Sequence, residues 1–120
     1  MARRRNRRRS EGAGRRGEAF AAWWFRLHGW RVIGRRVQTP RGEIDLIIRR
    51  WRTVAFIEVK WRRSVVERNR SLDLWSIRRA AEAAEAVAHN YAGPNDTIRI
   101  DGLLLTPWRW PRHIVNAWQP

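Results

Sequence analysis

Hydrophobic residues recur along the chain with two different periods, and each period predicts one type of element. From about Gly14 to His28 apolar residues return every three or four positions, which is typical of a helix, and Gly29 follows as its C-terminal cap. A second helix is predicted from Leu72 to Tyr91, because alanines occupy one of its faces and Gly93-Pro94 ends the pattern.

Shorter runs rich in β-branched residues predict five strands. These runs extend over Trp30 to Val37, Glu43 to Ile48, Val54 to Lys60, Thr97 to Thr106 and His113 to Trp118. Residues 61–71 show no clear period. The resulting order, α-β-β-β-α-β-β, predicts an α/β fold in which helices cover the faces of a mixed sheet.

The second and third predicted strands are close enough in sequence to form an antiparallel hairpin. If the loop is symmetric about positions 51 and 52, one face is apolar and pairs Ile44 with Val59, Leu46 with Ile57 and Ile48 with Ala55. The opposite face then pairs Ile47 with Phe56, Asp45 with Glu58 and Glu43 with Lys60. The charged residues of the hairpin are therefore expected on one face.

This charged face has the composition of a metal site. Two opposed carboxylates such as Asp45 and Glu58 repel each other unless a cation lies between them, and Mg²⁺ (or Mn²⁺) prefers carboxylate oxygens while keeping bound water. Lys60 is the only lysine, and its ammonium is suited to orient water or to stabilise charge on a phosphate. A solvated salt bridge among Glu43, Glu58 and Lys60 is the alternative explanation.

The chain is strongly basic. Its net charge of +15 and its pI near 12.0 indicate a polyanionic partner, with nucleic acid as the leading candidate. Genomic base composition that raises arginine and tryptophan usage is a second explanation, since the chain has nine tryptophans and one tyrosine. It has no cysteine and its histidines are far apart in sequence, so any metal is expected to have oxygen ligands.

The length of 120 residues suffices for one hydrophobic core. We therefore predict one domain over residues 14–120, preceded by an arginine-rich arm over residues 1–13 that lacks the apolar residues needed to pack. No apolar run is long enough to cross a bilayer, which predicts a cytoplasmic protein without membrane contact.

Several segments resemble the bacterial YraN-like family. They are Arg16-Gly17-Glu18-Ala19, His28-Gly29-Trp30-Arg31-Val32, Arg41-Gly42-Glu43-Ile44-Asp45-Leu46-Ile47, Phe56-Ile57-Glu58-Val59-Lys60, Arg99-Ile100-Asp101 and Asn116-Ala117-Trp118. The resemblance spans about residues 14–118 and implies a restriction-endonuclease-like core of the PD-(D/E)xK nuclease superfamily, related to archaeal Holliday-junction resolvases.

The resemblance also implies roles for individual residues. Asp45, Glu58 and Glu18 would bind the metal, and Lys60 would be the lysine of the E-x-K motif. Glu43 and Asp101 would have supporting roles, such as pairing with Lys60 or an arginine. The function implied is a metal-dependent endonuclease that acts on nucleic acid, with DNA expected over RNA. Branched and single-stranded DNA are the candidate substrates, and a homodimer is a candidate assembly, since the related junction resolvases work as two-fold dimers.

Three positions depart from the family pattern. Ile44 replaces the proline of the superfamily name, Trp61 is bulky where a small residue is usual, and arginines occupy positions 78 and 79 where a helix lysine is expected. These departures keep open a non-catalytic nucleic-acid-binding module. A small structural or partner-binding protein whose charge is compositional is a third interpretation.

We predict nucleic-acid contacts for a set of basic residues and for one aromatic residue at the expected hairpin tip. The set is Arg41, Arg62, Arg63, Arg78 and Trp51, of which Trp51 is a candidate to stack on an unpaired base or to fold back onto the sheet. The tryptophans at positions 23, 24 and 30 are expected in the core instead.

Overall fold

A five-stranded mixed sheet forms the centre of the computed structural model, which describes residues 17–119. Its strands lie in the order β1-β2-β3-β4-β5; β3 and β4 are parallel, and the other neighbours are antiparallel. Their bounds are β1 Arg31–Thr39, β2 Gly42–Arg50, β3 Thr53–Trp61, β4 Thr97–Leu105 and β5 Arg112–Ile114. The predicted mixed α/β fold is confirmed, and the arm predicted over residues 1–13 lies outside the described residues.

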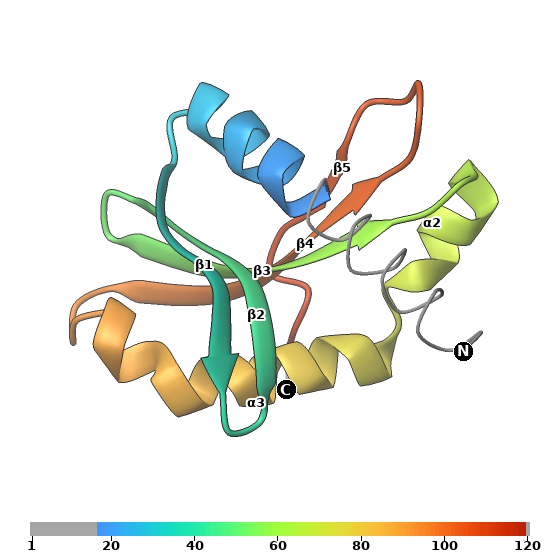
Figure 1. The fold of residues 1–120 in the computed structure, drawn as a ribbon. Helices are drawn as coiled ribbons and strands as arrows, with labels where there is room; N and C mark the ends of the chain where they lie inside the picture. Colours follow the sequence, from blue (N-terminus) through green and yellow to red (C-terminus); the bar gives the residue numbers. More distant parts are fainter. Residues whose placement is uncertain (1–16, 120) are drawn as a thin grey trace, which may run out of the picture.

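Helices cover both faces of this sheet (Figure 1). The helix over residues 17–27 packs on one face through Ala21, Ala22 and Phe25. The helix α3, Leu74–Tyr91, packs on the other face through Ala83 and Ala84. Because alanine has a small side chain, α3 can approach the sheet closely along this line.

The helix over residues 17–27 ends at the glycine expected from the sequence. Gly29 has φ +85°, its N–H donates to the carbonyl of Arg26, and the N–H of Trp30 donates to the carbonyl of Phe25. These two bonds form a Schellman motif, in which the left-handed residue is usually glycine. The motif directs the chain straight into β1.

A short helix that the apolar period did not predict connects β3 to α3. This helix, α2, covers Val65–Ser71, and Arg68 is its only buried residue. Its start has a local signal, because Ser64 is the N-cap and accepts from the backbone N–H of Glu67 three residues later. Serine followed by glutamate at that spacing is the capping-box pattern, and it could have revealed the helix.

The link between α2 and α3 packs against β4 at Gly102. A Cβ atom at this position would lie 2.6 Å from Leu72 Cδ2, so a larger residue would require the Leu72 side chain to shift. Asp73 then caps α3 by accepting from the backbone N–H of Ser76 at 2.8 Å. The start of α3 is thereby held near the end of β3.

The three tryptophans expected in the core differ in burial. Trp30 is buried beneath the guanidinium groups of Arg50 and Arg99, and Trp24 is half-buried. Trp23 is 56% exposed, so its prediction was wrong. It lies on the outer side of a helix whose apolar pattern is wider than the face that the sheet covers.

Among residues 17–119, no helix is long and apolar enough to span a membrane.

Candidate functional site

The strands β2 and β3 begin as a regular hairpin and then separate, and the candidate site lies where they separate. Leu46 opposite Ile57 is the last pair of their ladder, and the pairs from there to the turn agree with the predicted register. β3 is paired with β4 along its whole length and continues with it to Trp61. The Val59 N–H, which a continued hairpin would pair with backbone, donates to Asp45 Oδ2 at 2.8 Å.

Three predicted pairs lie beyond this point and are not ladder pairs: Asp45 with Glu58, Ile44 with Val59 and Glu43 with Lys60. Glu43 does not pair with Lys60, because the ladder between β2 and β3 has ended before it. Glu43 lies opposite Gln38 of β1 and accepts from Arg36 Nε at 3.0 Å and Gln38 Nε2 at 2.6 Å. Ile44 does not join the face of Leu46 either; it packs in the cluster on the α3 side. Ile44 and Leu46 therefore pack in different clusters, although strict alternation predicted one face for both.

A cavity of about 300 Å³ opens between the separated strands and α3. Its carboxylates are Glu43, Asp45 and Glu58, and the remaining lining residues are Arg41, Gly42, Ser76, Arg79, Ala80 and Ala83. The hairpin therefore brings Asp45 and Glu58 together as predicted, although they are not a ladder pair. α3 supplies the wall that no local pattern could place.

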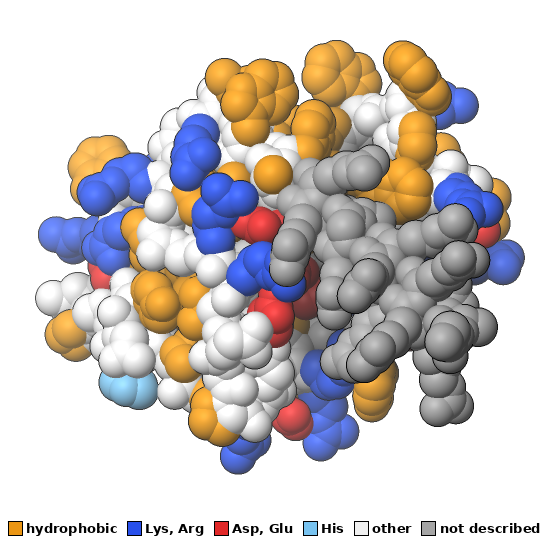
Figure 2. Space-filling view, in the orientation of Figure 1, with side chains coloured by type: hydrophobic (Ala, Val, Ile, Leu, Met, Phe, Trp, Pro, Cys, Tyr) orange, Lys and Arg blue, Asp and Glu red, His pale blue; other side chains and the backbone are white. Residues whose placement is uncertain are grey.

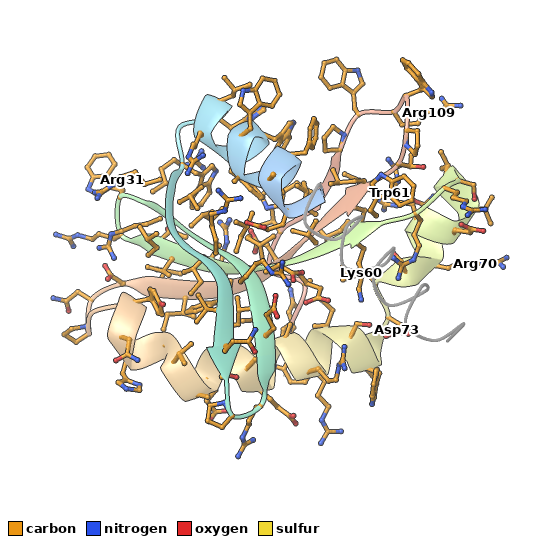
Figure 3. All side chains as sticks on the ribbon, viewed as in Figure 1. Arg31, Lys60, Trp61, Arg70, Asp73 and Arg109 are labelled. Carbon is orange, nitrogen blue, oxygen red and sulfur yellow. The ribbon has the colours of Figure 1, made fainter. Side chains whose placement is uncertain are left out.

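Lys60 lies beside this cavity on β3. Its Nζ is 3.2 Å from Glu58 Oε1, and the side chains of Lys60 and Glu58 are only 16% and 15% exposed. Figure 3 shows Lys60 directed toward the start of α3, where Asp73 lies. Hydrogen bonds from Ser76 lower the pKa of Asp73, and the positive charge of Lys60 lowers it further. Lys60 is thus paired with Glu58 and lies near enough to Asp73 for its charge to act on that carboxylate.

Burial and charge repulsion raise the pKa of Asp45 to about 7. Burial has the largest effect, and the negative charge of Glu58 adds to it; the bond from Val59 N–H acts in the opposite direction. A carboxyl group poised near neutrality in a cavity is a typical sign of a functional site. The same repulsion would be relieved by a cation between Asp45 and Glu58.

The fourth predicted catalytic residue, Glu18, has a different environment. It is buried on the helix over residues 17–27, and Arg35 Nε donates to its Oε1 at 2.5 Å. Glu18 does not line the cavity of Asp45 and Glu58. Its role as a metal ligand stays a prediction.

Asp101, expected in a supporting role, is fully buried on β4. It accepts from the Asn116 N–H and pairs with Arg99 and His113, each at 2.8 Å. These bonds lower its pKa against the effect of burial. Asp101 therefore fastens β5 and the following turn to β4, which is a structural role.

The predicted nucleic-acid contacts are spread over the surface. Arg41 lies at the acidic cavity, and Arg63 is exposed just after β3, while Arg62 Nη1 donates to the Trp61 carbonyl. Arg78 pairs with Glu82 and lines a separate cavity. The next residue, Arg79, lines the acidic cavity and stacks on Trp75 at 4.4 Å. The sequence did not reveal which of the two arginines faces the carboxylates.

The residues present fit a small oxygen-bound cation. Within residues 17–119 no three His, Cys, Asp or Glu side chains are gathered closely enough to hold a metal by themselves. Mg²⁺ is commonly held by one or two carboxylates together with water and substrate phosphate, and Asp45 and Glu58 match that donor set.

The fold and the site together define a mixed-sheet α/β protein with a carboxylate and lysine site where two strands separate. The chain belongs to the uncharacterised protein family UPF0102, the YraN-like family that the motifs indicated, and the family model matches residues 17–105. It is 55% identical to a UPF0102 protein of Sphingopyxis alaskensis over 92% of this chain and 96% of that protein. A UPF0102 protein of Erythrobacter litoralis is 51% identical, with the same two coverages.

Proposed function

We propose that this protein is a metal-dependent nuclease that hydrolyses phosphodiester bonds in nucleic acid. The observation that carries the proposal is the convergence of Asp45, Glu58 and Lys60 at one cavity in a protein of net charge +15. The basic surface favours a polyanionic substrate, and the two carboxylates would repel a phosphate unless a cation were bound between them.

Asp45 and Glu58 would hold the metal. Bound Mg²⁺ or Mn²⁺ supplies Lewis-acid polarisation of a phosphate oxygen. The Asp45 pKa of about 7 means that this carboxylate becomes available as a ligand near neutral pH. Val59 N–H holds one Asp45 oxygen, which fixes the carboxylate while leaving the other oxygen for the cation.

Lys60 would act on the phosphate or on the attacking water. Its ammonium is held by Glu58 at 3.2 Å and is largely shielded from solvent, so its charge acts in a region of reduced dielectric constant. Arg79 and Arg41 line the same cavity and would grip flanking phosphates. This assignment gives arginine the binding role and lysine the chemical role.

The test is a cleavage assay with branched, single-stranded and duplex substrates in Mg²⁺, Mn²⁺ and EDTA. Asp45→Asn and Lys60→Ala should each reduce cleavage by about a hundred-fold or more. The first removes a proposed metal ligand, and the second removes the positive charge beside the metal site. Lys60→Arg should not restore activity, since guanidinium has a different shape and does not release its proton.

Glu67→Gln is a matched control, because it removes an exposed carboxylate on α2, outside the residues that line the cavity. It should cleave like the wild type. Equal activity of wild type and Lys60→Ala on every substrate would refute the catalytic proposal. Binding without any metal-dependent cleavage would favour the alternative, a non-catalytic nucleic-acid-binding module with this fold.

A further inference from the structure

A second and larger cavity lies on the other side of β3 from Lys60. It has a volume of about 900 Å³, and aromatic side chains dominate its lining. The aromatic members are Phe20, Trp23, Trp24, Trp61, Trp108 and Trp110. Figure 2 shows hydrophobic side chains gathered on this part of the surface, over the helix of residues 17–27 and the β4–β5 loop.

Three of the five tryptophans that line this cavity are largely exposed. Trp108 is fully exposed, Trp110 is 87% exposed and Trp23 is 56% exposed. Contiguous exposed apolar surface of this kind is uncommon on proteins without a binding partner, and it marks an interaction site. These side chains are therefore available to a ligand.

The loop that carries Trp108 and Trp110 is held in a fixed shape. Pro107 and Pro111 restrict the backbone at its two ends, and the carbonyl of Trp110 accepts from Arg68 Nη1 of α2 at 3.0 Å. A rigid loop that presents large rings loses little entropy on binding. The restrained backbone thus keeps the two indoles at one place on the surface.

The surroundings of the cavity favour an anionic ligand with flat rings. Arg109 lies between the two loop tryptophans, Arg62 and Arg63 directly follow Trp61, and no carboxylate is among the described lining residues. The hydroxyl of Thr106, also in the lining, is buried without a hydrogen-bond partner among the described residues. A second copy of a chain with net charge +15 would be repelled electrostatically.

We propose that this cavity stacks unpaired bases of a nucleic-acid strand whose backbone continues to the carboxylate cavity. Trp61 and Lys60 are consecutive on β3, and Figure 3 shows their side chains leaving the strand in different directions. A strand that crosses this end of β3 places bases against Trp61 and phosphates toward Lys60. The inference rests on the proposed nuclease function and specifies its substrate as one with a single-stranded segment, since the faces of duplex bases are already stacked.

The test is binding measured in EDTA, where no cleavage occurs, by fluorescence anisotropy of a labelled single strand and of a blunt duplex. Trp108→Ala and Trp110→Ala should each weaken single-strand binding by about ten-fold, as is usual for loss of a stacked base, and should leave duplex binding nearly unchanged. Trp108→Phe and Trp110→Phe should restore most of the affinity, because phenylalanine keeps a flat ring.

Leu27→Ala is the matched control, since Leu27 is 63% exposed on the helix over residues 17–27 but does not line this cavity. It should have little effect on single-strand affinity. The proposal is overturned if wild type does not bind single strands, if the cavity variants bind them normally, or if Leu27→Ala causes the same loss. It is also overturned if the cavity variants change only the oligomeric state or only the binding of anionic vesicles.

The two proposals fail in different ways. Tryptophan-dependent binding without cleavage would retain the base-stacking site and reject the nuclease. The opposite result is metal-dependent cleavage by the wild type together with normal single-strand binding by Trp108→Ala and Trp110→Ala. It would retain the nuclease and reject the base-stacking site.

Discussion

At the scale of single residues, the ionised form of Asp45 that would bind a metal is also the form that destabilises the folded protein. Its folded-state pKa of about 7 is well above the ordinary value of 3.8, so the native state favours the neutral carboxyl group. The contribution of this group to stability is fully present below pH 3.8 and is lost as the pH rises through about 7. A cation bound by the ionised carboxylate would offset that loss, which links metal binding to pH.

Asp45→Asn should therefore stabilise the protein in alkaline solution. We expect a gain in the free energy of unfolding of about 1–3 kcal/mol near pH 8.5 and a much smaller gain near pH 5, measured by urea denaturation. The asparagine oxygen can still accept from the Val59 N–H, so the local structure is kept. An equal gain at both pH values would contradict the raised pKa.

Added Mg²⁺ provides the complementary measurement. It should stabilise the wild type near pH 8.5 but not the Asp45→Asn variant, because a ligand that binds only the folded state raises its stability. Glu67→Gln should respond to Mg²⁺ as the wild type does.

At the scale of elements, the β2–β3 hairpin determines both the register and the position of the site. Its turn consists of Trp51 and Arg52, as the symmetric loop predicted. Trp51 has φ 56°, a left-handed conformation that asparagine and glycine adopt more readily than tryptophan. The predicted stacking role of Trp51 would be one reason to keep a strained, exposed tryptophan there.

Trp51→Asn should stabilise the hairpin. We expect a gain of about 0.5–1 kcal/mol and a rise in Tm of a few degrees, because asparagine tolerates the left-handed conformation. Trp51→Ala is the control, since alanine is also small but does not favour positive φ. If the Trp51→Ala variant has the same Tm as the Trp51→Asn variant, the turn is not strained.

At the scale of the whole molecule, the arginines have either a functional or a compositional origin, and the salt dependence of nucleic-acid binding distinguishes the two. The chain carries +15, and neutralising phosphates releases counterions, so single-strand affinity should fall steeply with salt. Anisotropy titrations at several salt concentrations should give a linear log–log plot with a slope of roughly −0.7 per phosphate contacted. Absence of binding at every salt concentration would favour the compositional explanation and a structural or partner-binding protein.

The sequence by itself determined the features that depend on local backbone geometry. The period of three to four residues predicted the two main helices, Gly29 predicted the end of the first, and alternation with a short loop predicted the register from Leu46 to the turn. Each of these follows from residues near one another in the chain. The family motifs added Asp45, Glu58 and Lys60 as a set, which the structure brings together.

Only the tertiary structure decided what lies around that set. β2 separates from β3 beyond the pair of Leu46 and Ile57, while β3 stays paired with the distant segment β4 as far as Trp61. Glu43 then lies beside Arg36, and the separated strands leave the cavity that α3 closes. The aromatic cavity likewise combines the helix over residues 17–27, the end of β3 and the β4–β5 loop. Periodicity fixes which face of an element is apolar, but packing between distant segments fixes which faces meet.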